Sequence, residues 1–270
     1  MGVINVLSFA VANLIAAGEV VDRPASVIKE LMENAIDAGA TRVAVEIQHG
    51  GVTFMRVTDN GCGMSPDDLP VAIRRHATSK IKEAADLEGI ATLGFRGEAL
   101  AAIASVSDLR IISKTADAPF GALLQAHGGE HITVTEQGCS TGTSVIVENL
   151  FANVPARRKF LKKDVTETMA VTAYVEKIAL SNPGLAVRLV VDGTVKLETA
   201  GDGSLKSAIY ALFGREFANR LIEVNGENEG ITVRGYIGRT DNYKANRNFE
   251  NFFVNGRYVK SKTATAALEQ

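Results

Sequence analysis

Short segments of alternating polarity, separated by turn residues, constrain the fold of this chain most. In residues 41–48, Val43, Val45 and Ile47 alternate with polar or small residues, which is typical of a strand with one buried face. Gly50-Gly51 then indicates a tight turn into a return strand at 52–58. Further strands are expected at 109–114, 121–127, 131–135, 143–148, 185–191 and 194–198. Because most of these connections are hairpin-like, the sequence predicts a large, mainly antiparallel sheet.

Helical patterns accompany these strands. Val27, Leu31 and Ala35 recur four residues apart after Pro24, and Gly39 ends the pattern, so a helix with one apolar face is expected. Other helices are expected at 98–104, 166–180 and 205–213, with a helix start at 65–68. Residues 199–204, rich in Gly, Asp and Ser, are the best candidate for a linker. The sequence therefore predicts two α+β domains, 1–200 and 205–270, the second with strands at 220–224, 231–237 and 251–255.

Composition excludes several classes of protein. Of the 270 residues, 46% are hydrophobic, which is enough to form a core and argues against intrinsic disorder. The net charge of -2 excludes a polybasic protein but leaves room for local basic patches. The apolar runs are shorter than the ~20 residues of a membrane span, so no membrane partner is expected. Cys62 and Cys139 are too few for a disulfide framework or a four-ligand zinc site, and they fit a cytoplasmic location.

Familiar nucleotide and hydrolase motifs fail in this sequence. A Gly-x-x-x-x-Gly-Lys-Ser/Thr phosphate loop does not occur, and Gly61-Cys-Gly63 is followed by Pro66 where a dinucleotide fingerprint needs Gly. Ser140 lies in a Gly-x-Ser-x-Gly pattern, but a strand-like segment follows where the nucleophile elbow of a hydrolase leads into a helix. We therefore interpret the region around Ser140 as a turn.

The polar face of the first helix is the first candidate site. Glu30, Asn34 and Asp37 lie on one face at 100° per residue. The face is either ordinary solvated surface or a carboxylate base beside a carboxamide. In the second interpretation, Glu30 polarises a water molecule and the Asn34 oxygen coordinates a hard cation such as Mg²⁺.

Two glycine-rich segments allow a ligand to approach the backbone closely. Asp59, Gly61 and Gly63 end a strand, and they form either a tight turn or a surface for a planar ligand whose exocyclic amine donates to Asp59. Gly94 and Gly97 precede a helix, and they form either a flexible linker or a phosphate site built from backbone amides.

Taken in order, these segments resemble a known family. Glu30-x-x-x-Asn34, Asp59-x-Gly61-x-Gly63, Gly94-Phe-Arg-Gly97 and Gly142-Thr143 are similar to the four ordered motifs of the GHKL ATPases. Within that superfamily the sequence most resembles the MutL family of DNA mismatch repair ATPases. This closer resemblance is carried by residues 12–20, 23–26, 33–40, 75–80, 93–100, 155–161 and 255–257.

The resemblance implies a fold and a nucleotide site. The fold is a GHKL-type sandwich, a mixed but mainly antiparallel sheet with helices on one face, followed by a smaller domain of the ribosomal-protein-S5-like type. Glu30 is the implied catalytic base, Asn34 the magnesium ligand, and Asp59 the residue that reads the adenine amine. The implied ATP site and its lid also include Asp37, Gly61, Gly63, Thr78, Lys80, Gly94, Phe95, Arg96, Gly97, Glu98, Ala99, Leu100 and Thr143.

The resemblance also implies partners. Residues 12–20 are expected to clasp a second subunit in an ATP-dependent homodimer. DNA is expected to be contacted through its phosphates, because six basic and two acidic residues lie between Arg239 and Lys262. Arg257, Lys260 and Lys262 are the candidate contacts. The protein is expected to meet the mismatch-recognition protein MutS and a downstream nicking endonuclease or helicase, and so to couple recognition to strand incision.

One departure and two alternatives accompany this interpretation. The family has a His-Pro-x-Lys segment well beyond Asn255-Gly-Arg257, and this sequence ends at Gln270, so the second domain is expected to be incomplete. A histidine kinase catalytic domain is one alternative, distinguished by phosphate transfer to protein. The other is a non-enzymatic ATP-gated or DNA-binding scaffold, distinguished by ATP binding without turnover.

Overall fold

The chain forms two compact units in a computed structural model. The structure describes residues 17–81, 83, 86, 92–94, 97–242, 244 and 246–269. The first unit runs to Tyr174 and also includes Arg188–Lys196, whereas the second comprises Val175–Val187 and the chain from Leu197 onward. The domain boundary near residue 200 stays a prediction, and each unit is described by itself.

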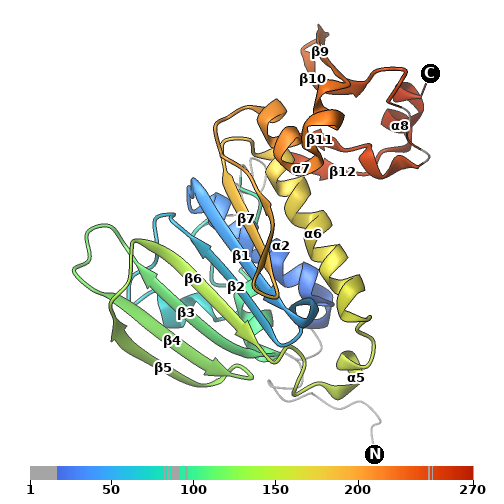
Figure 1. Cartoon of the computed structure of the whole chain (residues 1–270). Helices are drawn as coiled ribbons and strands as arrows, with labels where there is room; N and C mark the ends of the chain where they lie inside the picture. Colours follow the sequence, from blue (N-terminus) through green and yellow to red (C-terminus); the bar gives the residue numbers. More distant parts are fainter. Residues whose placement is uncertain are drawn as a thin grey trace, which may run out of the picture. The chain divides into compact units, whose positions relative to one another are not determined.

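A single eight-stranded sheet in the order β5-β4-β3-β6-β2-β1-β7-β8 dominates the chain (Figure 1). The pairings β1–β2, β2–β6, β6–β3, β3–β4 and β4–β5 are all antiparallel, which confirms the predicted sheet type. The strands are β1 Arg42–Gln48, β2 Phe54–Asp59, β3 Asp108–Lys114, β4 Gly121–His127, β5 Glu130–Gln137, β6 Gly142–Glu148, β7 Ala186–Val191 and β8 Thr194–Glu198.

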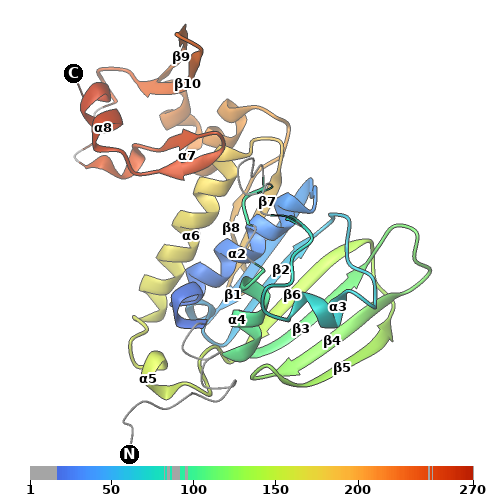
Figure 2. The ribbon, with the colours of Figure 1, turned by 180° about the vertical axis from the view of Figure 1, so that it is seen from behind.

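One face of this sheet carries the core. Val45, Val57, Val145, Ile111 and Leu124 occupy matching register positions on five neighbouring strands, and all are buried. Helices α2 Pro24–Asp37, α3 Leu69–Ala72 and α4 Ala99–Ser105 cover this face (Figure 2). The α+β fold with helices on one face of the sheet is therefore confirmed.

Helix α2 forms as its sequence predicts. Pro24 occupies the first helical position after an extended Arg23, and Val27, Ile28, Leu31 and Met32 are buried against the sheet. Burial of such a side chain contributes about 1.5–3 kcal/mol each, so packing fixes which face of the helix points inward. The opposite face carries the polar residues, whose side chains are partly exposed at Glu30 and nearly buried at Asp37.

The predicted elements differ from the structure mainly at their ends. The β1–β2 connection contains a short 3-10 turn, η1 His49–Gly51, so β2 begins at Phe54 and not at residue 52. The helix start expected at residues 65–68 yields only the one-turn α3. Helix α6 Asp164–Ser181 is slightly longer than expected, and the short α5 Pro155–Arg158 was not predicted.

The second unit has its own small core. Helix α7 Leu205–Asn219 continues past the expected end at residue 213, although Gly214 leaves the helical conformation with φ of 82°. Leu180, Ile209 and Ala218 form the buried cluster. The remaining elements are β9 Leu221–Asn228, β10 Ile231–Gly238, η3 Arg247–Phe249, β11 Phe252–Val254, β12 Arg257–Val259 and α8 Lys262–Leu268, of which η3, β12 and α8 were not predicted.

Within the part of the chain that the structure describes, none of the helices combines the length and the apolar character needed to cross a membrane.

Candidate nucleotide-binding site

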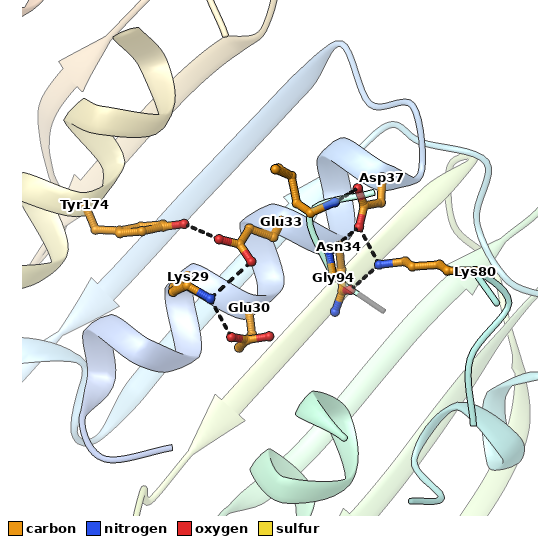
Figure 3. Close-up of polar contacts among 9 residues, drawn as sticks. Lys29, Glu30, Glu33, Asn34, Asp37, Lys80, Gly94 and Tyr174 are labelled. Atoms are coloured by element: carbon orange, nitrogen blue, oxygen red, sulfur yellow. Dashed lines mark hydrogen bonds and ion pairs between the residues drawn. The ribbon is translucent and has the colours of Figure 1, made fainter. Parts of the chain in front are cut away.

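The polar face of α2 is a network of charged side chains that contact one another, and not a row of independently solvated ones. Lys29 Nζ donates to Glu30 Oε1 at 2.8 Å and to Glu33 Oε2 at 3.2 Å (Figure 3). Tyr174 on α6 donates its hydroxyl to Glu33 Oε1 at 2.8 Å. Burial lowers the pKa of Lys29, but the hydrogen bonds and charges of Glu30 and Glu33 outweigh it, so the net effect raises that pKa.

Further along the same face, α2 meets the segment around residue 80. Lys80 Nζ donates to Asn34 Oδ1 at 3.1 Å and forms an ion pair with Asp37 (Figure 3). The Asp37 carboxylate also accepts from the backbone N–H groups of Leu93 and Gly94, at 2.9 and 3.0 Å. The structure thus brings together four residues that the sequence predicted for one site: Asn34, Asp37, Lys80 and Gly94.

Asp59 lies at the end of β2, opposite Thr143 of β6 in the sheet register. Its Oδ1 accepts from the backbone N–H of Gly61 at 2.8 Å. Burial raises the pKa of Asp59, and hydrogen bonds from the Gly61 and Thr143 backbones partly oppose this rise. A half-buried carboxylate held by backbone donors is a fixed acceptor, suited to a ligand that donates a hydrogen bond.

The glycines near Asp59 are required by close packing. A Cβ on Gly61 would lie 2.8 Å from Ala38 Cβ, just after α2, and the backbone N–H of Cys62 donates to the Ala38 carbonyl at 3.0 Å. Gly63 has φ of 72°, and a Cβ there would lie 2.0 Å from the Lys114 carbonyl oxygen. The Asp59 segment is therefore attached directly to the C-terminal end of α2.

The segment expected to cover the phosphates is described only in part. Phe95 and Arg96 lie outside the described residues. Gly97 has φ of 64°, and a Cβ there would lie 2.5 Å from the Ala77 carbonyl oxygen, so this residue packs beside the segment that carries Thr78. Glu98 is the N-cap of α4 and lies 3.8 Å from Arg75 and 3.6 Å from His76, while Ala99 and Leu100 form the first turn of that helix.

The donor set at the α2 face fits a magnesium ion delivered with a nucleotide. The described residues contain no group of three or more His, Cys, Asp or Glu side chains that could hold a metal. Mg²⁺ is commonly held by one or two protein oxygens, several waters and substrate phosphates, so it does not need such a cage. Asn34 Oδ1, which accepts from Lys80 Nζ in the structure, is a hard oxygen of the kind that Mg²⁺ binds.

Three contributors to the site, Lys29, Tyr174 and Ser113, escaped prediction from sequence. The polarity pattern placed Glu33 on the same polar face as Glu30, but it did not indicate that Lys29, four residues before Glu33, would pair with both carboxylates. Tyr174 has no motif around it. Ser113 of β3, which is fully buried, contacts Thr143 Oγ1 at 2.9 Å and accepts from the Met64 backbone at 2.8 Å.

Two other predicted features involve different segments of the chain. The region around Ser140 precedes strand β6 directly, which confirms a turn and not a nucleophile elbow. In the second unit, Arg257 begins β12, Lys260 follows that strand and Lys262 begins α8, and all three are exposed. Their role in DNA binding stays a prediction.

Sequence and structure comparisons identify similar proteins. The family described as "Histidine kinase-, DNA gyrase B-, and HSP90-like ATPase" matches residues 22–131, and "DNA mismatch repair protein, C-terminal domain" matches residues 209–270. Proteins named "DNA mismatch repair protein MutL" from Agathobacter rectalis and Caldanaerobacter subterraneus are each 48% identical, over 99% and 100% of this chain. The chain spans only 41% and 46% of the lengths of these two relatives.

A solved structure matches at the level of the fold. The "Aquifex aeolicus MutL ATPase domain complexed with ADP" superposes with a TM-score of 0.72 and is 31% identical, and the match covers 93% of this chain and 88% of that one. The expected resemblance is therefore confirmed over nearly the whole sequence, and this chain belongs to the MutL family of DNA mismatch repair proteins, with the GHKL ATPase fold of that family.

Proposed function

We propose that this chain binds ATP with Mg²⁺, hydrolyses it, and forms the nucleotide-dependent part of a DNA mismatch repair protein. The observation that carries the proposal is the arrangement along α2, where Glu30, Asn34 and Asp37 share one face that leads to the half-buried carboxylate of Asp59. The ADP complex of the Aquifex aeolicus relative supports a nucleotide as the ligand.

The arrangement suggests how the nucleotide lies. Adenine donates its amine to Asp59, beside Gly61, Gly63 and Thr143. The phosphates extend along α2 past Asp37 and Asn34 towards Glu30. Glu30 and Ala38, the residue that contacts the Asp59 segment, are eight positions apart on this helix, or about 12 Å along its axis. A base at one end and an adenine acceptor at the other can therefore serve one extended ligand.

Glu30 accepts a proton from the attacking water. Lys29 holds Glu30 Oε1, and the contacts of Glu30 with the described residues use only that oxygen, which leaves Oε2 to accept the proton. Asn34 would hold a Mg²⁺, which would neutralise charge on the phosphates. Lys80 leaves its contacts with Asn34 and Asp37 and pairs with a phosphate of the nucleotide. Thr78 and residues 94–100 then close over the phosphates.

Closure of this lid is proposed to drive dimerisation. In this proposal, dimerisation couples recognition of a mismatch by MutS to strand incision by a nicking endonuclease or to unwinding by a helicase. The proposed location is the cytoplasm. Residues 12–20 are the proposed clasp to the second subunit, although residues 12–16 lie outside the described part of the chain. Exposed basic residues at 257, 260 and 262 support phosphate contact with DNA.

Substitution of the base tests the catalytic claim. In the full-length protein, Glu30→Ala should lower the ATP turnover rate by ~10²–10⁴-fold, the usual contribution of a general base. Nucleotide affinity, measured by calorimetry, should stay within about threefold because Asp59 and Asn34 remain. Glu130→Ala, on the exposed strand β5, is the matched control.

Unchanged turnover in Glu30→Ala would show that Glu30 is an ordinary polar surface residue. Loss of binding and turnover together would assign it a structural role. ATP binding without turnover in the unsubstituted protein would favour the scaffold alternative, and phosphate transfer to protein would favour the kinase alternative.

The DNA proposal has its own test in the second unit. Lys262→Glu should weaken binding to all duplex sequences similarly, because a phosphate contact carries no sequence information. It should flatten the plot of log affinity against log salt by about 0.9, the slope per phosphate contact. The control Lys206→Glu makes the same charge change at an exposed position of α7. Equal slopes for both variants would remove Lys262 from the DNA surface.

A further inference from the structure

A chain of three hydrogen bonds connects helix α6 to the proposed base. The Tyr174 hydroxyl donates to Glu33 Oε1, Lys29 Nζ donates to Glu33 Oε2, and the same ammonium donates to Glu30 Oε1 (Figure 3). Tyr174 lies 141 residues from Glu33 in the sequence, so the contact depends on the packing of α6 beside α2. The three bonds have lengths of 2.8, 3.2 and 2.8 Å.

The chemistry of these groups determines which of them donates and which accepts in each of the three hydrogen bonds. Burial and the charge of Glu33 raise the pKa of Tyr174, so its hydroxyl stays protonated and acts as a donor. Both oxygens of Glu33 are therefore occupied, one by Tyr174 and one by Lys29. With Glu33 held at both oxygens, the ammonium of Lys29 has an anchored partner at one side and donates to Glu30 at the other.

An isolated ion pair on a helix surface would not produce this constraint. Pairs such as Lys29 and Glu33 at i,i+4 exchange readily with water and hold side chains weakly. The Glu33 side chain is only 14% exposed, and its second partner comes from a different helix. This anchoring from outside α2 converts a common surface pair into a defined support.

We infer that Tyr174, Glu33 and Lys29 are positioning residues for Glu30, which hold its Oε1 and so direct its Oε2 towards the attacking water. The inference deepens the proposed function and rests on the assignment of Glu30 as the base. None of the three residues contacts the proposed adenine acceptor Asp59. Their loss should therefore change the rate of hydrolysis and not the affinity for the nucleotide.

Tyr174→Phe is the first test, because it removes the hydroxyl and keeps the buried ring. In the full-length protein we expect kcat to fall by about tenfold, less than the ~10²–10⁴-fold loss expected without the base. The dissociation constant of a non-hydrolysable ATP analogue should not change. Tyr210→Phe is the matched control, since it removes the hydroxyl of a tyrosine that is 52% exposed on α7.

Lys29 provides the second test, which separates positioning from general support of the fold. Lys29→Met should also lower kcat at unchanged affinity, and adding Tyr174→Phe to it should cause little further loss, because residues acting through one another are non-additive. Lys29→Arg, which keeps a cation able to reach both carboxylates, should recover part of the lost rate.

The outcomes distinguish the inference from the proposed function. Three results would overturn the positioning role while leaving Glu30 as the base. They are full activity in Tyr174→Phe, additive losses of kcat in the double variant, and a loss of nucleotide affinity that parallels the loss of kcat. Wild-type turnover in Glu30→Ala would overturn the assignment of Glu30 as the base, and no turnover in the unsubstituted protein would overturn the proposed hydrolysis. Either result removes the positioning role as well.

Discussion

The two ends of the proposed nucleotide site are built in different ways. At the adenine end, backbone N–H groups of Gly61 and Thr143 hold Asp59, and these groups are fixed by the β2–β6 register and by packing against Ala38. At the phosphate end, backbone N–H groups of Leu93 and Gly94 also hold Asp37, but the Lys80 ammonium is shared between the side chains of Asn34 and Asp37. The Asp59 acceptor is held by backbone donors, whereas the Lys80 contacts join side chains and can exchange partners.

This difference suggests a division of roles. A fixed acceptor defines where adenine lies before the rest of the ligand arrives. Side-chain pairs at the other end can be replaced by phosphate and Mg²⁺, and that replacement provides a way to signal that a nucleotide has bound. The rigid end, at Asp59, should therefore determine the affinity for the nucleotide, and the exchangeable end, at Lys80, should determine how the protein changes when the nucleotide binds.

The largest effect expected from this comparison belongs to Asp59→Asn. Loss of a hydrogen bond to a charged acceptor costs ~1.5–3 kcal/mol. Nucleotide affinity should therefore fall by about 10- to 150-fold, which calorimetry with ADP can measure. An affinity within threefold of wild type would show that the rigid end does not bind adenine through this carboxylate.

The pH dependence of stability in wild type and Asp59→Asn tests separately whether Asp59 is a buried carboxyl with a raised pKa. The folded-state pKa of Asp59 is raised, so the folded protein binds its proton more tightly than the unfolded chain does. The stability that this carboxyl contributes is present at acid pH and is lost as pH rises through its raised pKa. The melting temperature of wild type relative to Asp59→Asn should thus improve as pH falls from neutral towards 3.8. If the difference in melting temperature between the two proteins does not change with pH, burial does not raise the pKa of Asp59.

Sequence predicted the helices and strands that carry the site better than the contacts between their side chains, for a physical reason. The strands that carry Asp59 and Thr143, and the helix with Glu30 and Asn34, follow from local polarity patterns and turn residues, which side-chain periodicity determines. The contacts of Tyr174 and Ser113 depend on packing between elements far apart in the sequence, and no local pattern encodes them.

Lys80 illustrates the same limit. The family motif suggested a residue that meets the phosphates, but no local pattern indicated that its ammonium would pair with Asn34 and Asp37. Element ends were also misjudged where tertiary contacts outweigh local preference, as at α7, whose helix resumes beyond Gly214. Patterns thus predicted which residues gather, while the structure was needed to show which of them are partners.

The smallest effect is expected for Lys80→Met, and it tests the exchangeable end directly. In the structure the ammonium already has two oxygen partners, so moving it to a phosphate replaces one set of favourable contacts with another. The net contribution to affinity should be no more than ~1 kcal/mol, or about fivefold, at saturating Mg²⁺.

The magnesium dependence of the same variant should change more than its affinity. Without Lys80, no ammonium has to leave Asn34 before Mg²⁺ binds there. Mg²⁺ then becomes the main positive charge that faces the phosphates. Binding of a non-hydrolysable ATP analogue should therefore depend more steeply on Mg²⁺ concentration than in wild type. Lys196→Met, at an exposed position of β8, should leave both quantities unchanged. If Lys80→Met instead reduces affinity as much as Asp59→Asn does, the phosphate end is an anchor of equal strength, and the proposed division between a rigid end and an exchangeable end is wrong.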